Sequence, residues 1–338
     1  MNPVNTKPYK LPEDAVWLIT GCSSGIGRAI ATLVASKPKH RLIATARNPA
    51  ADLAYLPDDN PNILKLALDV TSTSSVDDAF ASAAAAHFDE GGDGKFHLDI
   101  VVNNAGYSLS GDTESATEEE AHLEMETLFF GTARVTMRAI GVMRPQQQPA
   151  GEAGETGDGD GDGDGEGVRR GGIVFNMSSL AGLCAFAGHA YYHAGKFAVE
   201  GFSESVAREV HPDWGGGFFS FFSMVVAVNV CIVEPSGVKT NFEGHSKART
   251  KPHPAYAGQD MPARRLEAYV NMGIKSGAGM MDPAAVAEAI YKVASRGERV
   301  PLRLPLGAVA WKMAKARFEG LLQEFEAVKE ISGMGQQL

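Results

Sequence analysis

The residues best suited to chemistry are a serine, a tyrosine and a lysine in the second half of the chain. Tyr192 and Lys196 stand four residues apart, and Ser179 precedes Tyr192 by thirteen residues. Residues four apart on a helix share a face, so the phenol and the ammonium are expected to lie together. A free phenol loses its proton near pH ~10, and a neighbouring cation lowers that pKa. The spacing therefore predicts a tyrosine that exchanges protons at neutral pH.

Two adjacent side chains compete for this role. Tyr191 stands five residues before Lys196, which places it off the same helical face. His193 follows Tyr192 directly and points elsewhere on a helix, so we expect it on the surface or in the core.

A glycine-rich turn near the start of the chain predicts a nucleotide site. Thr-Gly-Cys-Ser-Ser-Gly-Ile-Gly occupies residues 20–27, after an apolar run and before a helical pattern. Its glycines permit a tight turn and a close approach to a pyrophosphate, and the amides that open the helix favour negative charge. The expected cofactor contacts in this turn are Gly21, Ser23, Ser24, Gly25, Ile26 and Gly27.

Four motifs in this order resemble the short-chain dehydrogenase/reductase family. Beside the glycine turn and the Tyr-x-x-x-Lys pair with its serine, the chain has Asn-Asn-Ala-Gly at 103–106 and Pro-x-Gly-x-x-Thr at 235–240. The motifs look most like those of hydroxysteroid and retinol dehydrogenases and of fungal ketone reductases. The resemblance implies hydride transfer between a nicotinamide cofactor and a carbonyl or carbinol carbon.

The same resemblance assigns roles to individual residues. Tyr192 would exchange the proton of the substrate oxygen, Ser179 would hydrogen-bond that oxygen, and Lys196 would lower the pKa of Tyr192 and hold the nicotinamide ribose. Tyr192 and Lys196 thus also count as cofactor contacts. The remaining contacts implied are Asp69 and Val70 at the adenine, Asn103, Ala105 and Gly106 at the ribose side, and Pro235, Val238 and Thr240 at the carboxamide end.

The end of the second apolar run indicates which cofactor is bound. Ala-Thr-Ala-Arg at 44–47 lacks the acid that would bind a ribose 2'-hydroxyl, and Arg47 can pair with a 2'-phosphate. This favours NADP(H) over NAD(H). The alternative is that Arg47 is an ordinary solvated loop cation.

One position departs from the family pattern. Relatives carry an asparagine three residues before the glycine that stands here at Gly131, and this chain has Leu128. That asparagine is thought to hold a water that reconnects the lysine to solvent, and leucine has neither donor nor acceptor for water. Either another water path substitutes, or the enzyme is impaired or performs chemistry less dependent on proton resupply.

Apolar runs alternate with helical patterns along the chain, which predicts an α/β fold with a doubly wound parallel sheet and helices on both faces. A helix is expected over 283–295. Ligands of such sheets bind beyond the carboxyl ends of the strands, where all the motifs fall. The expected strands cover 16–20, 42–46, 63–68, 98–102, 173–177, 229–233 and, at the edge, 302–304.

The chain has 338 residues, whereas one Rossmann domain of this family needs roughly 250 to 280, so tails and insertions are expected. We assign 1–14 to a surface tail and 15–338 to a single domain. The Gly/Asp-rich segment 146–172 is predicted to be a disordered linker. The alternative, a calcium loop begun at Asp158, has Asp160 and Asp162 in place but is disfavoured by Arg169, which stands where a bidentate glutamate belongs.

A second insertion is expected at 215–228. The chain carries no charge from 215 to 233, which is long enough for a membrane span to be considered. Its second half must, however, be the strand that delivers Pro235 and Thr240 to the cofactor, so no transmembrane span is expected. A hydrophobic protrusion, a lipid-touching loop and a retained intron in the gene model all remain open.

Composition limits the partners. Of the formal net charge of −10, seven acids lie within 151–167, so the rest of the chain is only mildly acidic and nucleic acid is not an expected partner. The three cysteines lack ligand spacing, which predicts no metal, no disulfide and a reducing, cytoplasmic location. Relatives pair the helices corresponding to 121–143 and 191–210, so a homodimer is expected.

We therefore predict an NADP(H)-dependent ketoreductase or alcohol dehydrogenase acting on an apolar small molecule such as a secondary metabolite, steroid or retinoid. Segment 241–281 should cover the substrate, where Tyr256, Met261, Tyr269 and Met272 line a pocket or belong to the core. The alternative is a non-redox cyclase, isomerase or cofactor-binding protein of the same fold, which Leu128 keeps open.

Overall fold

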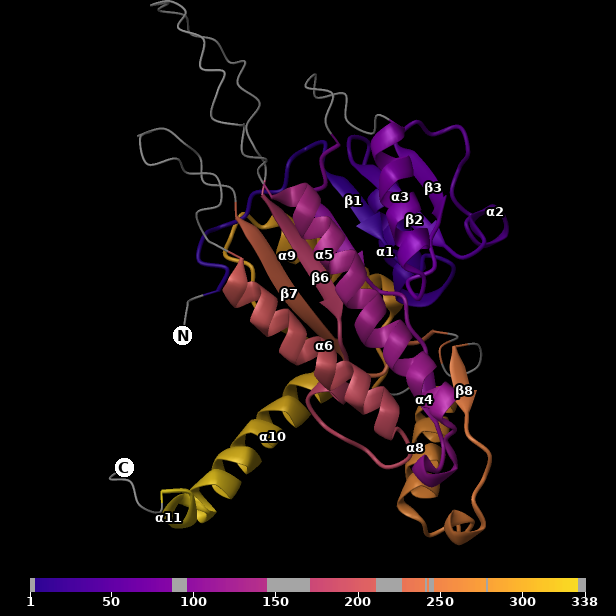
Figure 1. Ribbon diagram of the computed structural model, residues 1–338, viewed down its shortest axis with the longest axis vertical. Helices are drawn as coiled ribbons and strands as arrows, with labels where there is room; N and C mark the ends of the chain where they lie inside the picture. The colour runs from indigo at the N-terminus through magenta and orange to yellow at the C-terminus, as the bar shows by residue number, and fades with distance from the viewer. Residues whose placement is uncertain are drawn as a thin grey trace, which may run out of the picture.

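The computed structural model describes residues 4–86, 96–144, 171–210, 227–240, 242, 246–277 and 279–333. Its centre is a seven-stranded sheet in the order β3-β2-β1-β4-β6-β7-β9, with every neighbouring pair parallel (Figure 1). This confirms the predicted doubly wound α/β fold and its edge strand. The strands are β1 (Val16–Ile19), β2 (Arg41–Ala46), β3 (Ile63–Ala67), β4 (Ile100–Asn103), β6 (Gly172–Met177), β7 (Val228–Pro235) and β9 (Arg303–Leu306).

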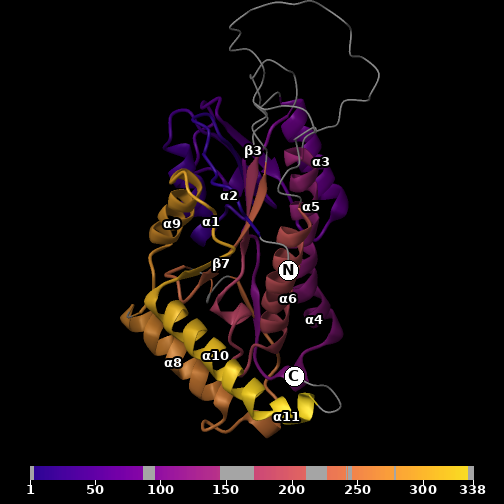
Figure 2. The same ribbon diagram turned by 90° about the vertical axis from the view of Figure 1, so that its left-hand side faces the viewer.

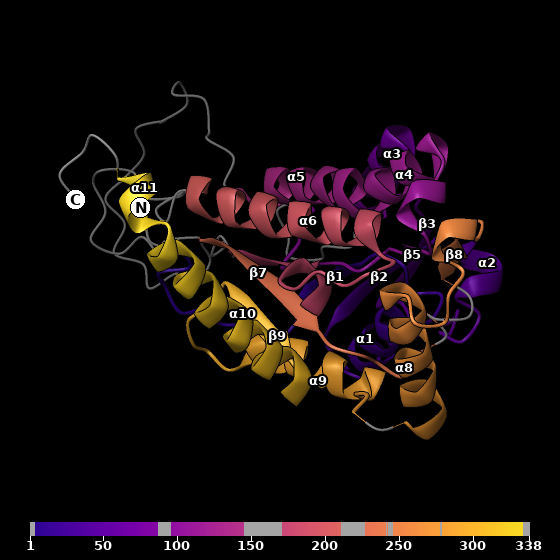
Figure 3. The same ribbon diagram turned by 90° about the horizontal axis from the view of Figure 1, so that it is seen from below.

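Helices cover both faces of the sheet, as Figures 2 and 3 show. One layer contains α1 (Gly25–Ala35) and α9 (Pro283–Ser295), where α9 has the bounds predicted. The other contains α3 (Thr73–Ala85), α5 (Gly131–Met143) and α6 (Ala190–Glu209). Two apolar cores result, one on each face, because strands of a parallel sheet are buried on both sides.

The helix that leads into the site is continuous but irregular. It begins as α4 (Glu118–Met125), widens into a π-helical turn, η2 (Glu126–Phe130), and continues as α5. Thr117 and Glu120 form a capping box that fixes its start. Leu128 lies in the π turn, a feature that in other proteins often marks functional sites.

The described part of the N-terminal segment, 4–14, is mostly exposed or half-buried but is attached to the domain at two buried residues. The Asn5 side chain donates to Val230 O at 2.8 Å and to Val300 O at 3.1 Å, and accepts from Val230 N at 3.1 Å. Tyr9 is buried in the core on the α1 and α9 side. The polar composition gave no sign of this attachment, because one amide side chain satisfies three backbone groups of β7 and the segment before β9.

The segment after β7 forms a separate small unit. β8 (Lys247–Arg249) pairs in parallel with β5 (Ser108–Ser110), and α8 (Pro262–Ser276) follows. Asp112, which is buried, accepts from His253 N at 2.9 Å and pairs with Arg264 at 2.6 Å. These contacts attach the expected substrate region to the loop after β5.

The two expected insertions lie almost entirely outside the described residues. β6 begins at Gly172 and β7 at Val228, so the last residues assigned to each insertion belong to strands. After β9 the chain ends in α10 (Ala308–Ala327), which projects from the body (Figure 1), and α11 (Lys329–Ser332). Shorter elements are α2 (Pro49–Asp52), η1 (Thr113–Ser115), η3 (Leu180–Gly182) and η4 (Pro254–Tyr256).

Candidate active site

The glycine turn after β1 is fixed to the loop after β4. Thr20 Oγ1 accepts from the backbone N–H groups of Asn104 (2.9 Å) and Ala105 (3.0 Å). The Asn104 side chain donates to Thr20 O (3.0 Å) and Gly21 O (3.1 Å). A Cβ on Gly21 would stand 2.9 Å from Ala105 Cα, so only glycine permits this approach. Asn104 thus holds together two of the predicted cofactor motifs, a role that sequence reasoning missed.

The start of α1 fits a pyrophosphate. Gly21 and Gly25 adopt φ of +70° and +57°, conformations that favour glycine. The N-cap Ser24 makes no side-chain capping bond and no acidic residue lies in the first turn. The helix's first amides are therefore left without a capping side chain, as an anion-binding helix start requires.

Ser179 lies at the carboxyl end of β6 beside the end of β7. Its hydroxyl accepts from Ala181 N at 3.1 Å and lies 3.5 Å from Pro235 O. His193 secures the same loop, because Phe186 N donates to its Nε2 at 2.9 Å and Nδ1 lies 2.7 Å from Ala181 O. The first contact makes Nε2 an acceptor, so Nδ1 carries the proton. His193 is therefore a core residue that positions the serine loop.

Tyr192 and Lys196 project from one face of α6, as predicted. The Lys196 Nζ stands 5.8 Å from the centre of the Tyr192 ring and donates to Met177 O at 2.7 Å. Burial lowers the pKa of Lys196 to about 8, opposed by the negative charges of Glu124 and Glu200. Tyr192 is half-buried, with its ring centre 6.2 Å from that of Phe242. The lysine thus keeps a positive charge near the phenol at neutral pH.

The predicted nucleotide contacts around β2 and β3 lie at the carboxyl ends of those strands. Arg47 is exposed directly after β2, and its side chain makes no ion pair within the described part of the chain. The Asp69 carboxylate accepts from Thr71 N at 2.9 Å and Thr71 Oγ1 at 2.7 Å. Val70 O accepts from Arg134 at 2.9 Å. Arg47 is therefore available to a ligand, whereas Asp69 shapes its own turn.

The loop after β7 reaches the glycine turn. A Cβ on Gly25 would stand 3.3 Å from Thr240 Cγ2, so Thr240 lies over the start of α1. Val238 forms a parallel bridge with Met281, which connects this loop to the segment before α9. The structure therefore gathers the motifs after β1, β4, β6 and β7 with Tyr192 and Lys196 at one edge of the sheet.

Asn103 has a structural role at this edge. It is buried, and its amide donates to Thr136 Oγ1 at 2.9 Å and to Asn176 Oδ1 at 2.8 Å. These bonds join β4, α5 and β6 beneath the site. The amide nitrogen is thus occupied by protein contacts, whereas Oδ1, which is also buried, has no hydrogen-bond partner among the described residues.

Leu128 fills the space next to the lysine. Its methyl groups lie against two glycines: a Cβ on Gly106 would stand 2.9 Å from Leu128 Cδ2, and one on Gly195 would stand 3.0 Å from Cδ1. Leu128 is almost fully buried. An apolar side chain therefore occupies the position of the amide that relatives carry, directly beside the residue preceding Lys196.

Glu124 is the polar residue of this region that sequence reasoning missed. It lies one helical turn before Leu128, is fully buried, and accepts from Leu109 N through Oε2 at 3.1 Å. Burial raises its pKa to about 7. Nothing in its sequence context distinguishes it from the exposed acids that precede it on α4, because burial depends on the neighbours that α6 and β5 supply.

Two of the residues expected to line a substrate pocket are not in the core. Tyr269 and Met272 on α8 are 71% and 65% exposed. The Tyr256 hydroxyl donates to Glu114 at 3.0 Å, and Met261 directly precedes α8 without making a side-chain capping bond. The reading of Tyr269 and Met272 as plain core residues is therefore wrong.

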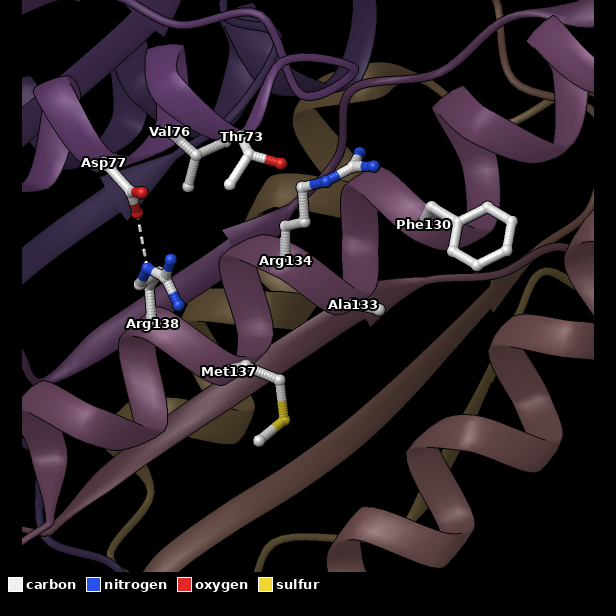
Figure 4. Close-up of a pocket in the computed structure, with 8 residues that line it drawn as sticks. All are labelled: Thr73, Val76, Asp77, Phe130, Ala133, Arg134, Met137 and Arg138. Carbon is white, nitrogen blue, oxygen red and sulfur yellow. Dashed lines mark hydrogen bonds and ion pairs between the residues drawn. The ribbon is translucent and has the colours of Figure 1, made fainter.

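A hollow of about 330 Å³ lies between α3 and α5 (Figure 4), and Ser179, Tyr192 and Lys196 do not line it. Phe130, Met137 and Arg134 face it, and an ion pair between Arg138 and Asp77 closes one side. Among the described residues there is no group of three or more potential metal ligands and no helix long and apolar enough to cross a membrane.

Comparisons with known proteins agree with this geometry. The family model for short chain dehydrogenases matches residues 15–153 and 167–251. The oxidoreductase calM of Penicillium decumbens is 58% identical over 334 residues, covering 99% of this chain and 97% of that protein. A short-chain dehydrogenase from Streptomyces avermitilis has a TM-score of 0.71 at 30% identity, covering 94% of this chain and 98% of that one. Solved structures of this fold at lower identity hold either NAD or NADP.

Proposed function

Because the chain belongs to the short-chain dehydrogenase family and is an oxidoreductase of that type, we propose that it interconverts a ketone or aldehyde and an alcohol with NADP(H). The substrate is an apolar small molecule of secondary-metabolite, steroid or retinoid kind. The observation that carries this proposal is the meeting of Ser179, Tyr192 and Lys196 with the glycine turn at one sheet edge.

The residues divide the chemistry between them. NADPH, when bound, supplies a hydride from its nicotinamide ring. Tyr192 Oη gives its proton to the oxygen of the reduced carbonyl, and the Ser179 hydroxyl stabilises the charge that develops on that oxygen. Lys196, held by Met177 O, keeps a positive charge beside the phenol and favours its ionisation.

The experiment that tests this function is NADPH oxidation with a panel of apolar ketones. We expect turnover that falls by about 10²- to 10⁴-fold in Tyr192→Phe while NADPH binding persists, because the ring still packs but cannot exchange a proton. Tyr191→Phe is the matched control, since this neighbouring phenol is also half-buried and lies on another face. Full ketone reduction by Tyr192→Phe would refute the mechanism.

The preference for NADP(H) rests on Arg47. Its exposed guanidinium follows β2 without a described partner, and β2 ends without an acid. A planar guanidinium binds phosphate by two parallel hydrogen bonds, whereas an acid there would select the ribose hydroxyl of NAD.

A second candidate function rests on Leu128. Leu128 stands where relatives carry the asparagine amide that they use in proton resupply. A non-redox cyclase, isomerase or cofactor-binding protein of this fold would not need that amide. The ketone panel separates the two, because such a protein would bind NADPH without oxidising it.

The proposal extends to assembly and location. α4, the π turn, α5 and α6 carry exposed apolar side chains, which are Leu123, Phe130, Met137 and Phe197. A homodimer that packs these faces together would bury them. The three cysteines are free and buried, which suits a reducing compartment such as the cytoplasm.

A further inference from the structure

The buried carboxylate of Glu124 is only partly satisfied by the protein. Oε2 accepts from Leu109 N at 3.1 Å, and the phenol of Tyr107 approaches the carboxyl from the loop after β4, but Oε1 has no hydrogen bond of normal geometry among the described residues. The side chain has no exposed surface. A buried carboxylate left partly unsatisfied is destabilising, so its retention calls for a functional explanation.

The position of Glu124 connects it to the catalytic lysine. α4 and the π turn that contains Leu128 both pack along α6, and both side chains are buried, so Glu124 and Leu128 lie on the same side of this helix. Leu128 packs against Gly195, the residue before Lys196, and α4 packs along α6. Of the charges that act on Lys196, Glu124 has the largest effect. No ion pair joins Lys196 and Glu124 in the described part of the chain, and the Lys196 amine donates to Met177 O instead.

With Leu128 at this position, few groups near Lys196 can supply it with a proton. Its methyls seal the space between Gly106 and Gly195 and offer water no partner. On its own helix Lys196 is faced by Glu200, which pairs with Arg303, and Arg303 also pairs with Glu234 of β7. Glu124 is faced by Lys196 from α6, by Tyr107 from the loop after β4 and, on its own helix, more remotely by Glu120.

We propose that Glu124 is a positioning residue that returns protons to Lys196, in place of the water held by the amide that relatives carry at Leu128. This rests on the proposed reductase function. In ketone reduction the Tyr192 O–H bond breaks as the proton passes to the substrate oxygen, and an N–H proton of Lys196 replaces it. The Glu124 carboxyl then gives its proton to the lysine nitrogen, and the carboxylate recovers a proton from solvent by way of the half-buried Tyr107 phenol that approaches it.

The proton affinities suit this exchange. Burial raises the pKa of Glu124 to about 7, and burial lowers the pKa of Lys196 to about 8. Groups with similar pKa values pass a proton with little change in free energy. At neutral pH the carboxyl is therefore partly protonated and can act as donor.

Glu124→Gln tests the proposal, because glutamine keeps the size and the acceptor for Leu109 N but cannot titrate. We expect kcat for ketone reduction to fall about tenfold or more, with a larger solvent deuterium isotope effect and unchanged NADPH affinity. The dependence of kcat on a group near pH 7 should disappear. Glu118→Gln, an exposed acid on the same helix, is the matched control.

Adding an amide at position 128 provides the rescue. In the Glu124→Gln background, Leu128→Asn should restore most of the lost turnover, which a merely structural role of Glu124 does not predict. Unchanged kcat, isotope effect and pH profile in Glu124→Gln, with NADPH still bound, would overturn the relay. Absence of ketone reduction in the unmodified protein would instead refute the proposed function.

A stability measurement tests the carboxyl without turnover. The folded pKa of Glu124 exceeds its ordinary value of 4.5, so the folded state binds the extra proton and stability falls as pH rises from about 4.5 to about 7. Glu124→Gln should remove this part of the pH dependence. An identical dependence in both proteins would show that the carboxyl does not titrate there, which overturns the proposal even in an inactive enzyme.

Discussion

Two of the catalytic side chains are held by backbone from different strands. Lys196 donates to Met177 O of β6, and Ser179 lies against Pro235 O of β7. His193 secures the serine loop through two backbone contacts, and burial lowers its pKa. Such contacts fix the geometry before ligands bind, which lowers the entropic cost of reaching a reactive arrangement.

The cofactor preference is a prediction about one residue, Arg47. Arg47→Asp should repel a 2'-phosphate and shift the preference toward NAD(H) by about one to two orders of magnitude, at about 1.4 kcal/mol per tenfold. Catalytic efficiencies with NADPH and NADH measure this shift. Lys312→Asp changes the net charge equally on the remote α10 and should leave the ratio unchanged. Equal efficiencies with both cofactors in the unmodified protein would contradict the assignment.

Among the elements, α8 and the small β5–β8 sheet stand apart from the main sheet. Their attachment depends on Asp112, which is 1% exposed and bound by His253 N and by Arg264. Burial opposes the charge of Asp112, but these donors hold its pKa below the ordinary value. The buried carboxylate of Asp112 thus anchors α8 and the β5–β8 sheet. Its negative charge is stabilised by the two donors, His253 N and Arg264.

Removing the partner of Asp112 should loosen this element. Arg264→Ala leaves the carboxylate short of one donor, and since Arg264 is 18% exposed and water can reach its place, we expect a loss of about 1–3 kcal/mol. Amide exchange in α8 and the melting temperature report it. Arg249→Ala in β8 breaks an exposed ion pair with Glu267 of α8, and this substitution should reduce stability by only about 0–1 kcal/mol. Equal effects of the two variants would argue against the anchor.

At the scale of the whole molecule, the outer face of α4, α5 and α6 is the surface for the proposed dimer. Phe130 and Met137 are about half exposed there, at 48% and 51%, and face the hollow of Figure 4. The nearby ion pair of Arg138 and Asp77 supplies a polar rim. An apolar centre with a polar rim is the usual composition of a protein interface.

Met137→Glu should shift the protein from dimer to monomer, because it introduces an unpaired charge into the centre of this face. Sedimentation or light scattering gives the mass. Phe325→Glu is the control, since Phe325 is 66% exposed on α10, away from the face. A mass that responds to Phe325→Glu and not to Met137→Glu would assign the interface to α10 instead.

The sequence alone determined the seven-stranded parallel sheet and the place of its site. Several strands are followed directly by a motif. The carboxyl ends of parallel strands lie at the same edge of the sheet, so these motifs come together regardless of the sequence that connects the strands. The pairing of Tyr192 with Lys196 was equally predictable, because it depends only on helical periodicity. The spacing of residues within the sequence carries this information, so both features can be predicted from a single sequence.

Only the tertiary structure decided the roles of Asn5, His193 and Glu124. The Asn5 side chain hydrogen-bonds to the backbone of Val230, which lies 225 residues away in the sequence. The His193 ring contacts Ala181 O in the loop that follows β6. Glu124 resembles the exposed acids before it on α4, yet packing against α6 buries it beside Lys196. Burial and proton affinity depend on neighbours distant in the chain, which no local pattern encodes.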